Sequence, residues 1–224
     1  MRQNSMLDEL ITLLNDLAKS REEQDLIAAT LKALDDQYEL TRKISQEPGL
    51  KDIVLQLIGR VYQAFGSLTT VKEKRILDIA SGSNSSKAPS SVFVNTPFGE
   101  RHVPTSGSEG YTAQFEPWFC RILLEIGADP VGIDLGDLEQ ETFEHYQIDL
   151  GQPGALNFLP EHSFDAVQDS RLFGSPEFTT QIPRQTDRLK VAAEIWKQEQ
   201  RLLKANGIVI HSDATNLLGE NRMQ

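Results

Sequence analysis

From residue 75 onward, short apolar runs that end in acidic or small residues alternate with segments of helical periodicity. The runs occupy residues 75–79, 130–134, 145–150, 164–168 and 207–212. The helical segments cover residues 114–126, a short acidic stretch after Gly136, and residues 188–203. Strands that alternate with helices form βαβ units, in which the strands are parallel and the helices cover the sheet. The sequence therefore predicts an α/β domain over residues 71–224.

The first part of the chain has a different pattern, with apolar residues at helical spacing and a break at Pro48-Gly49. We expect residues 1–70 to form a helical region that precedes the α/β domain. The apolar positions include Leu10, Leu14, Leu31, Leu34, Ile53, Leu57, Val61 and Phe65.

Residues 85–111 interrupt the alternation, because they are rich in Ser, Gly and Pro and lie where a βα loop normally has about 2–6 residues. A long loop at this place is usually functional or disordered. Residues 91–94 and 100–103 can pair as a small hairpin within it. We therefore treat residues 85–111 as an inserted loop.

The most informative stretch is residues 76–84, where a strand that carries Asp78 is followed by the small residues Ala80, Ser81, Gly82, Ser83 and Asn84. Small residues allow a backbone to approach a ligand closely, and open α/β sheets bind ligands beyond the carboxyl ends of their strands. An ordinary tight turn between a strand and a helix would have the same composition. This alternative stays open on the residues alone.

This stretch resembles motif I of the class I, Rossmann-like methyltransferases that use S-adenosylmethionine. The family has glycine at three alternate positions of the loop. Gly82 is retained, whereas Ala80 and Asn84 stand at the first and third positions. Because Asn tolerates a positive φ better than most residues, we expect the backbone shape of the loop to be preserved.

The later elements follow the order of the same family. The run that ends at Asp134 resembles the second strand, whose acid binds the ribose, and a carboxylate can accept hydrogen bonds from both ribose hydroxyls. Asp134 lies about 50 residues beyond the loop instead of the usual 20 or so, and the insertion accounts for the surplus. Residues 146–150, 159–167 and 193–213 resemble the third strand, the fourth strand, and the last helix and strand.

The resemblance implies a mostly parallel sheet in the order 3-2-1-4-5 and S-adenosyl-L-methionine as the cofactor. In relatives the acid at Asp149 receives the adenine amino group, and an apolar side chain, here Leu150, lies against the ring. The cofactor-binding residues implied in this way are Asp78, Ala80, Ser81, Gly82, Ser83, Asn84, Asp134, Leu135, Asp149, Leu150 and Asp169.

No catalytic residue is assigned, because methyl transfer depends mainly on positioning and needs a base only where the acceptor must lose a proton. Asp169 and His211 are candidate bases, although each is better explained as a supporting or surface group. We expect the acceptor to lie beside residues 168–171, with residues 85–111 and the N-terminal helices as lids.

Relatives usually add two strands after the fifth, and the sequence leaves little room for them. We therefore expect a sheet without strands 6 and 7. Its fifth strand would be an exposed edge that invites pairing. That edge and the N-terminal helices are the surfaces through which a homo-oligomer would form.

Composition limits the partners. The net charge of −11 opposes binding to nucleic acid, and no stretch approaches the roughly 18 apolar residues of a membrane span. His145 and His162 have no metal-ligand spacing with Cys or acids, so no metal is expected. We predict a cytoplasmic protein that acts on a small-molecule acceptor.

Several other polar or aromatic residues have structural interpretations. We expect Cys120 and the two tryptophans, Trp118 and Trp196, to lie in the core. Asp165 is expected to be a structural acid at a strand edge. Glu199 and Arg201 are expected on a solvated helix face.

Three hypotheses about function remain. The first is a small-molecule methyltransferase, favoured by Asp134 and Asp149. The second is a non-catalytic module that binds S-adenosylmethionine or another protein, favoured by Ala80 and Asn84. The third, a nicotinamide-dependent oxidoreductase, is disfavoured because the loop lacks the three glycines that bring a helix N-terminus onto a pyrophosphate.

Overall fold

The fold is known from a computed structural model. It describes residues 3–84, 87–88, 91–96, 99–104, 110–169, 172, 178 and 181–210. Of residues 3–5, and of the described residues between 87 and 111, it describes the backbone alone.

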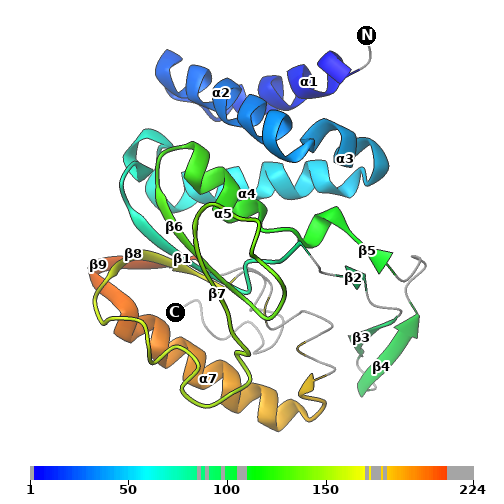
Figure 1. The fold of residues 1–224 in the computed structure, drawn as a ribbon, viewed down its shortest axis with the longest axis vertical. Coiled ribbons are helices and arrows are strands. Elements are labelled where there is room, and N and C mark those ends of the chain that lie inside the picture. The colour runs from blue at the N-terminus through cyan, green and yellow to red at the C-terminus, as the bar shows by residue number, and fades with distance from the viewer. Residues whose placement is uncertain are drawn as a thin grey trace.

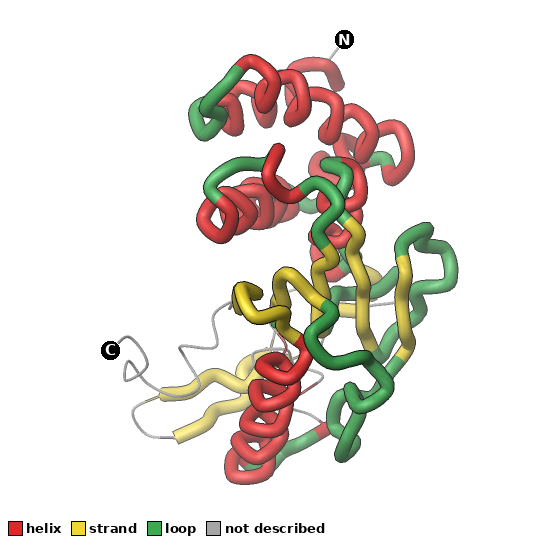
Figure 2. The backbone as a smooth tube through the Cα atoms, turned by 90° about the vertical axis from the view of Figure 1, so that its left-hand side faces the viewer, coloured by secondary structure: helices red, strands yellow, loops and turns green. Residues whose placement is uncertain are grey.

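The helices lie in layers on the two faces of a central sheet (Figures 1 and 2). They are α1 (Gln3–Asn15), α2 (Arg21–Tyr38), α3 (Leu40–Gln46), α4 (Gly49–Phe65), α5 (Trp118–Glu125) and α7 (Gln185–Leu202), with the short 3-10 turns η1 (Thr69–Val71) and η2 (Ala113–Phe115). α1 to α3 form the outermost layer, and α4 and α5 lie between them and one face of the sheet. α7 covers the opposite face, so the site-bearing loops emerge from a sheet that is covered on both sides.

The central sheet has five parallel strands in the order β7-β6-β1-β8-β9. They are β1 (Arg75–Ile79), β6 (Asp129–Asp134), β7 (Glu144–Gln147), β8 (Phe164–Gln168) and β9 (Leu203–Ile210). In chain order this arrangement is 3-2-1-4-5, so the predicted order is confirmed. It is compatible with a Rossmann-like fold.

The helical pattern predicted for residues 1–70 is confirmed over the described residues. Ser20 caps α2, since its Oγ accepts a hydrogen bond from the Glu23 N–H at 3.2 Å. Gly66, at a φ of 76°, ends α4 in the left-handed conformation. The break predicted at Pro48 separates α3 from α4.

Two hydrophobic clusters cover the two faces of the sheet, because successive residues of a strand point to opposite sides. We call them the α5-face cluster and the α7-face cluster. The α5-face cluster joins Ile76, Ala166 and Ile210 of the sheet to apolar residues of all five helices α1 to α5. The α7-face cluster contains Leu77, Ile79, Val131, Ile133, Val167, Ala192, Ile195 and Leu202.

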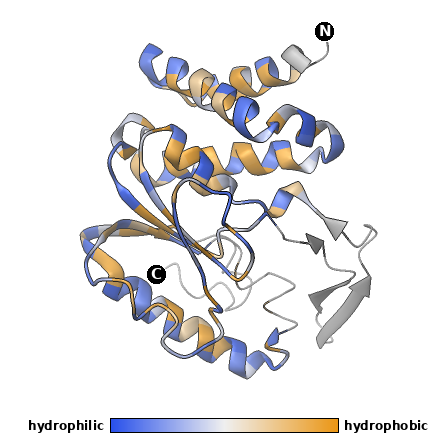
Figure 3. Cartoon of the chain, in the orientation of Figure 1, coloured by the Kyte–Doolittle hydropathy of each residue, from blue (hydrophilic) through white to orange (hydrophobic). Residues whose placement is uncertain are grey.

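The helices before residue 70 thus share one core with the α/β part of the chain. Figure 3 shows mainly hydrophobic residues along α4, which lies within this core, and a mixture of hydrophobic and hydrophilic residues along the more exposed α7. The division into two domains near residue 70 remains a prediction. Residues before and after this point pack together in the α5-face cluster.

The predicted helix over residues 114–126 was wrong at its start. Residues 113–115 form η2, and α5 begins only at Trp118. Pro117 accounts for the break, because its ring disfavours a helical conformation in the residue before it and Pro is accepted only at the beginning of a helix.

The short acidic helix predicted after Gly136 does not form, and turns and bends occupy this stretch instead. Two carboxylates compete with helical hydrogen bonds there. Asp134 Oδ1 accepts the N–H of Gly136 at 2.8 Å, and Asp137 Oδ1 accepts the N–H of Glu139 at 2.8 Å.

Four strand boundaries also differ from the prediction. β6 begins at Asp129 and β7 at Glu144, each one residue early, and β7 ends at Gln147, before Asp149. β9 begins at Leu203 instead of residue 207, with an irregular register opposite β8, and residues 211–212 lie outside the described residues. The predicted hairpin is confirmed as β3 (Ser91–Thr96) paired with β4 (Gly99–Pro104), beside a second small pair of β2 (Lys87–Ala88) and β5 (Gly110–Tyr111).

The structural interpretations of single residues have mixed outcomes. Trp118 and Cys120 are buried as expected, and Trp196 is partly buried against the α7-face cluster. Asp165 is structural as expected, because it accepts the N–H of Arg75 and pairs with Lys204.

The expectation for Glu199 and Arg201 was wrong. Glu199 is only 1% exposed, and the two Nη atoms of Arg201 donate to the carbonyl oxygens of Leu159 and Leu156. Arg201 therefore ties the last helix to the turns before β8, and these charges belong to the packing rather than to a solvated face.

Glu23 is the buried acid that joins the first two helices to the segment before β1. It is 2% exposed, and its carboxylate accepts the N–H groups of Lys19 and Leu68 and the hydroxyl of Ser67. Burial by itself would raise the pKa of this carboxyl, but the hydrogen bonds outweigh it and the pKa lies below its ordinary value. The ionised carboxylate therefore stabilises the fold.

We predict that Glu23→Gln lowers the free energy of unfolding by about 1–3 kcal/mol at pH 7, because buried N–H donors lose a charged acceptor. A lowered pKa contributes stability above the ordinary value of 4.5 and loses it as the pH falls through the lower folded-state pKa. The difference between variant and wild type should therefore shrink in urea titrations below pH 4.5. Glu22→Gln, at an exposed neighbouring position, is the control and should change little; an equal effect of both variants would contradict the prediction.

Candidate functional site

The candidate site lies where the loops after β1 and β6 meet at the carboxyl ends of the strands. Asp78 of β1 pairs in register with Gly132, two residues before Asp134, so both acids project toward the face that α5 covers. Asp149 follows the end of the neighbouring strand β7. The strand pairing thus brings the three predicted acids to one edge of the sheet.

Asp134 is the link between the two loops. Its Oδ2 accepts the N–H of Gly82 at 2.9 Å, and its Oδ1 accepts the N–H of Gly136 at 2.8 Å. Burial raises the pKa of this carboxyl above its ordinary value of 3.8, and these N–H groups only partly offset the effect. A carboxyl with a raised pKa at a strand end is a candidate functional group.

The loop after β1 uses its backbone donors within the protein. The N–H groups of Ser81 and Ser83 donate to the carbonyl oxygens of Ile133 and Phe115, at 3.0 and 2.9 Å. That of Asn84 donates to the Asp137 carbonyl at 3.1 Å, and that of Gly82 to Asp134. Four consecutive donors are thus satisfied by three neighbouring segments, which fixes the loop against β6 and α5.

Gly82 is required by this internal packing. Its φ is 89°, a region in which side chains other than glycine are strained, and an added Cβ would lie 2.2 Å from the Phe115 carbonyl oxygen. The segment that leads into α5 therefore makes the close approach that the sequence suggested for a ligand. Gly136 has a similar role, because an added Cβ would lie 2.0 Å from Ser83 Oγ.

We expected Asn84 to preserve the shape of the loop because Asn tolerates a positive φ, and this reason was wrong. Asn84 does not adopt a positive φ, whereas Ala80 does, at 59°. The first and second of the family's three glycine positions, Ala80 and Gly82, thus have a positive φ, which costs an alanine at the first about 1–2 kcal/mol. Asn84 must have a different role.

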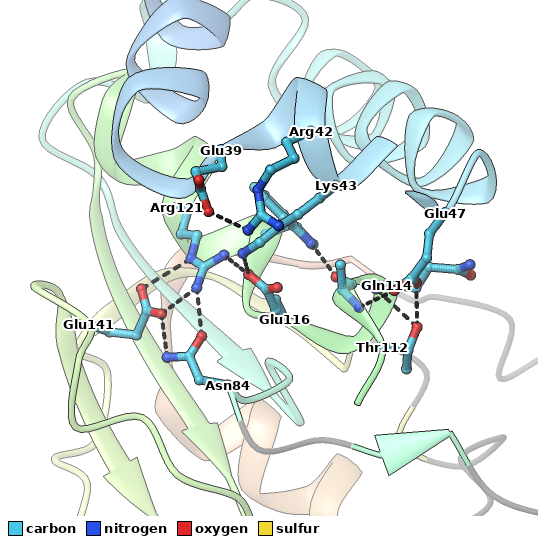
Figure 4. A network of polar contacts seen from close by, with 12 residues as sticks. Glu39, Arg42, Lys43, Glu47, Asn84, Thr112, Gln114, Glu116, Arg121 and Glu141 are labelled. Atoms are coloured by element: carbon cyan, nitrogen blue, oxygen red, sulfur yellow. Dashed lines mark hydrogen bonds and ion pairs between the residues drawn. The ribbon is translucent and has the colours of Figure 1, made fainter. Parts of the chain in front are cut away.

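The side chain of Asn84 belongs to a buried polar cluster that the sequence analysis missed (Figure 4). Its Oδ1 accepts from Arg121 Nη2 at 2.7 Å, and its Nδ2 donates to Glu141 Oε1 at 2.8 Å. Arg121 also pairs with Glu116 and with Glu141. The signal in the sequence was an arginine inside the apolar run of residues 118–124, because a buried cation requires partners.

Asp78 is fully buried instead of facing the open edge of the sheet. Gln168 Nε2 donates to its Oδ1 at 3.4 Å, and Cys120 Sγ lies 3.7 Å from its Oδ2. Burial raises the pKa of the Cys120 thiol well above its ordinary value, and the Asp78 carboxylate adds to the effect. Asp78 thus anchors the strands beneath the loop.

The residues after β6 and β7 differ in their exposure. Leu135 is 44% exposed, and its carbonyl oxygen accepts from Gln147 Nε2 at 2.9 Å. Asp149 holds a turn, since its Oδ1 accepts the N–H of Gly151 and its Oδ2 accepts from the side chain of Gln152. Leu150 is buried in the α7-face cluster. Leu135 is therefore the apolar side chain with surface left to contact a ring.

The remaining predicted residues are mostly enclosed. Ser81 and Ser83 are 6% and 1% exposed, and Asp169, directly after β8, is 1% exposed. Residues 170–171 and His211 lie outside the described residues. Among the described side chains, no group of three His, Cys, Asp or Glu residues is arranged to hold a metal ion.

Comparisons with known proteins assign no family, because no family model, curated protein or solved structure matches the chain. In the described part of the chain no helix is both long enough and apolar enough to cross a membrane.

We predict that Gly82→Ala lowers the free energy of unfolding by about 2–5 kcal/mol, from left-handed strain of about 1–2 kcal/mol and overpacking of about 1–3 kcal/mol. Gly59→Ala is the control. Its added Cβ would meet nothing within 4 Å, and alanine in a helix should raise stability by about 0.5–1 kcal/mol. Urea denaturation measures both changes, and an unchanged midpoint for Gly82→Ala would refute the packing described above.

Proposed function

We propose that the chain binds S-adenosylmethionine at the edge formed by residues 80–84 and Asp134, and that it transfers the methyl group to a small molecule. The observation that carries the proposal is the chemistry of this edge. The N–H groups of residues 81–84 donate within the protein, while Asp134 supplies a carboxylate to the same edge. The edge is therefore better suited to a ligand that donates hydrogen bonds than to one that accepts them.

S-adenosylmethionine fits this requirement because its ammonium group and ribose hydroxyls donate hydrogen bonds, and its sulfonium adds a positive charge that a carboxylate attracts. A dinucleotide has the opposite requirement, since its pyrophosphate needs free N–H donors at a helix N-terminus. The loop offers no such run of donors, because each N–H from Ser81 to Asn84 already has an acceptor. A nicotinamide-dependent oxidoreductase is therefore disfavoured.

The sheet order supports the same proposal, since β1, β6 and β7 occupy the places that carry the cofactor in the family that the sequence resembles. Asp134 would accept the ribose hydroxyls, because its two oxygens have lone pairs beyond those used by Gly82 and Gly136. Leu135 would contact the adenine ring, and Asp149 its amino group.

The cofactor would supply an electrophilic methyl group, and the protein would hold the acceptor in line with it. The end of β8 at Gln168 and Asp169 borders this edge, next to Asp78. A net charge of −11 favours a small acceptor over a nucleic acid.

A second candidate function is a module with a methyltransferase-like fold that binds without transferring a methyl group. It is favoured by the internal use of both ligand-binding acids, since Asp134 joins two loops and Asp149 holds its own turn. Binding of the cofactor without turnover of any acceptor would favour this candidate over the enzyme.

We predict that S-adenosylhomocysteine, the product of methyl transfer, raises the melting temperature and that NAD does not. At about 100 times its Kd a ligand stabilises the native state by about 2.7 kcal/mol, which corresponds to about 5–10 °C for a chain of this size. Differential scanning fluorimetry with both ligands measures the shifts. Stabilisation by NAD alone, or by neither compound, would contradict the proposed function.

We further predict that Asp134→Asn weakens binding of S-adenosylhomocysteine at least about tenfold, because a hydrogen bond to a charged acceptor contributes about 1.5–3 kcal/mol. Asp129→Asn is a matched control on the same strand, since it removes the same charge at the opposite end of β6, where Asp129 pairs with Arg75. Isothermal titration calorimetry should give an unchanged Kd for the control. Equal Kd values for both variants would exclude Asp134 from the site.

A further inference from the structure

The backbone of Asn84 does not explain why asparagine stands at the third glycine position of the family that the sequence resembles. Its φ is not positive, so the residue is not needed for a left-handed turn. Both polar atoms of its side chain are held instead, Oδ1 by Arg121 and Nδ2 by Glu141 (Figure 4). The side chain thus ties the end of the loop to α5 and to the segment before β7.

Arg121 is the hub of this connection. It is 2% exposed, and its Nε and Nη2 donate to the two carboxylate oxygens of Glu141 at 3.2 and 2.6 Å. Its Nη1 donates to Glu116. The guanidinium also lies 4.0 Å from the ring centre of Tyr38 and 4.8 Å from that of Trp118. A planar guanidinium held on every side fixes the position of whatever it binds, here Asn84.

The N-terminal helices reach the same hub through a second cation. Lys43 of α3 is 2.7 Å from Glu116 Oε2, the oxygen that also accepts from Arg121. The carbonyl of Glu116 lies against the loop, since an added Cβ on Gly82 would be 2.9 Å from it. A chain of contacts therefore runs from α3 through Glu116 and Arg121 to the loop.

The charges of this chain balance, with two cations and two carboxylates among Lys43, Arg121, Glu116 and Glu141. Three of these side chains are at most 2% exposed, and that of Lys43 is 15% exposed. Removing one charge leaves an uncompensated neighbour in a buried site, which is costly. The other members must then shift or admit water, and the loop moves with them.

We propose that Arg121 is a positioning residue for the ligand-binding loop, and that Lys43 couples the packing of α3 to ligand binding at residues 81–84. The identity of the ligand rests on the proposed function, whereas the coupling between α3 and the loop does not. Coupling of this kind is reciprocal, so that a ligand at the loop strengthens the packing of α3 as much as the packing of α3 favours the ligand.

The first test restores the family's glycine. If the third position mattered only for backbone shape, Asn84→Gly would leave the affinity for S-adenosylhomocysteine unchanged or improve it. The side-chain link predicts an affinity at least about fivefold weaker, the lower end of typical couplings between sites. Calorimetric titration gives the Kd, and an unchanged or tighter Kd would overturn the role of Arg121.

The second test separates the coupling from a general loss of stability. Lys43→Met should weaken binding about fivefold or more without altering any residue of the candidate site. Lys51→Met is the control, because Lys51 also pairs with a carboxylate of another helix, that of Glu9 at 2.6 Å, in a more exposed place outside the cluster. It should leave the Kd unchanged. Equal effects of Lys43→Met and Lys51→Met would refute the coupling.

A third measurement needs no ligand and keeps this inference distinct from the proposed function. Hydrogen exchange of the amides of residues 81–84 in the free protein should be faster in Lys43→Met than in wild type, and unchanged in Lys51→Met. If wild type does not bind S-adenosylhomocysteine but this pattern is seen, the proposed function fails and the coupling stands. Equal exchange in all three proteins would refute the coupling.

Discussion

The hydrogen bonds that hold the loop after β1 are the constraint on which the rest of the site depends. Residues 81–84 donate to β6, to Asp134, to the segment before α5 and to Asp137. A loop held from so many directions can shift only if its neighbours shift as well. Its shape is therefore set by how α5 and the β6–β7 connection pack, and less by the glycines within it.

At the carboxyl end of β1 the two faces of the sheet differ in polarity. Leu77, Ile79 and Ile133 face α7 and pack in one cluster. On the other face, Asp78 and Gln168 hydrogen-bond to each other beneath the loop. This hydrogen bond connects β1 to β8 within the buried part of the sheet.

The sequence was sufficient for the strand order, because the predicted strands follow one another as they do in a known family. It was less successful where side chains override local pattern. Pro117 shortened a predicted helix, and the carboxylates of Asp134 and Asp137 replaced another with turns. Glu199 and Arg201 had the spacing of a solvated helix face but are used in packing.

The site was predictable only in part, for a similar reason. The loop and Asp134 follow from the motif and from the position of strand ends in a parallel sheet. The polar cluster around Asn84 does not, because its members Lys43, Glu116 and Glu141 are distant from Asn84 in sequence and have no motif of their own. A single arginine in an apolar helix indicates that partners exist, but only the packing of α3 and of the β6–β7 connection identifies them.

Asp165 and Asp134 are acids of the central sheet whose pKa values are shifted in opposite directions. The Asp165 carboxyl is partly buried, which raises its pKa, but hydrogen bonds from Lys204 and the Arg75 N–H lower the pKa below its ordinary value, so the ionised group stabilises the fold at neutral pH. Burial raises the pKa of Asp134, and the groups that oppose this effect are backbone N–H groups rather than cations. With a raised folded-state pKa, stability is lost as the pH rises through that pKa, so the ionised Asp134 costs folding free energy.

Asp134 accepts the Gly82 N–H with one oxygen and the Gly136 N–H with the other, whereas an amide, with its single acceptor oxygen, could not accept both. A carboxylate whose charge burial disfavours gains most from a ligand that brings donors or a positive charge to it. The sulfonium, ammonium and hydroxyl groups of S-adenosylmethionine are ligand groups of this kind. The raised pKa of Asp134 and its place between the two loops together make the edge beside Gly82 the candidate binding site.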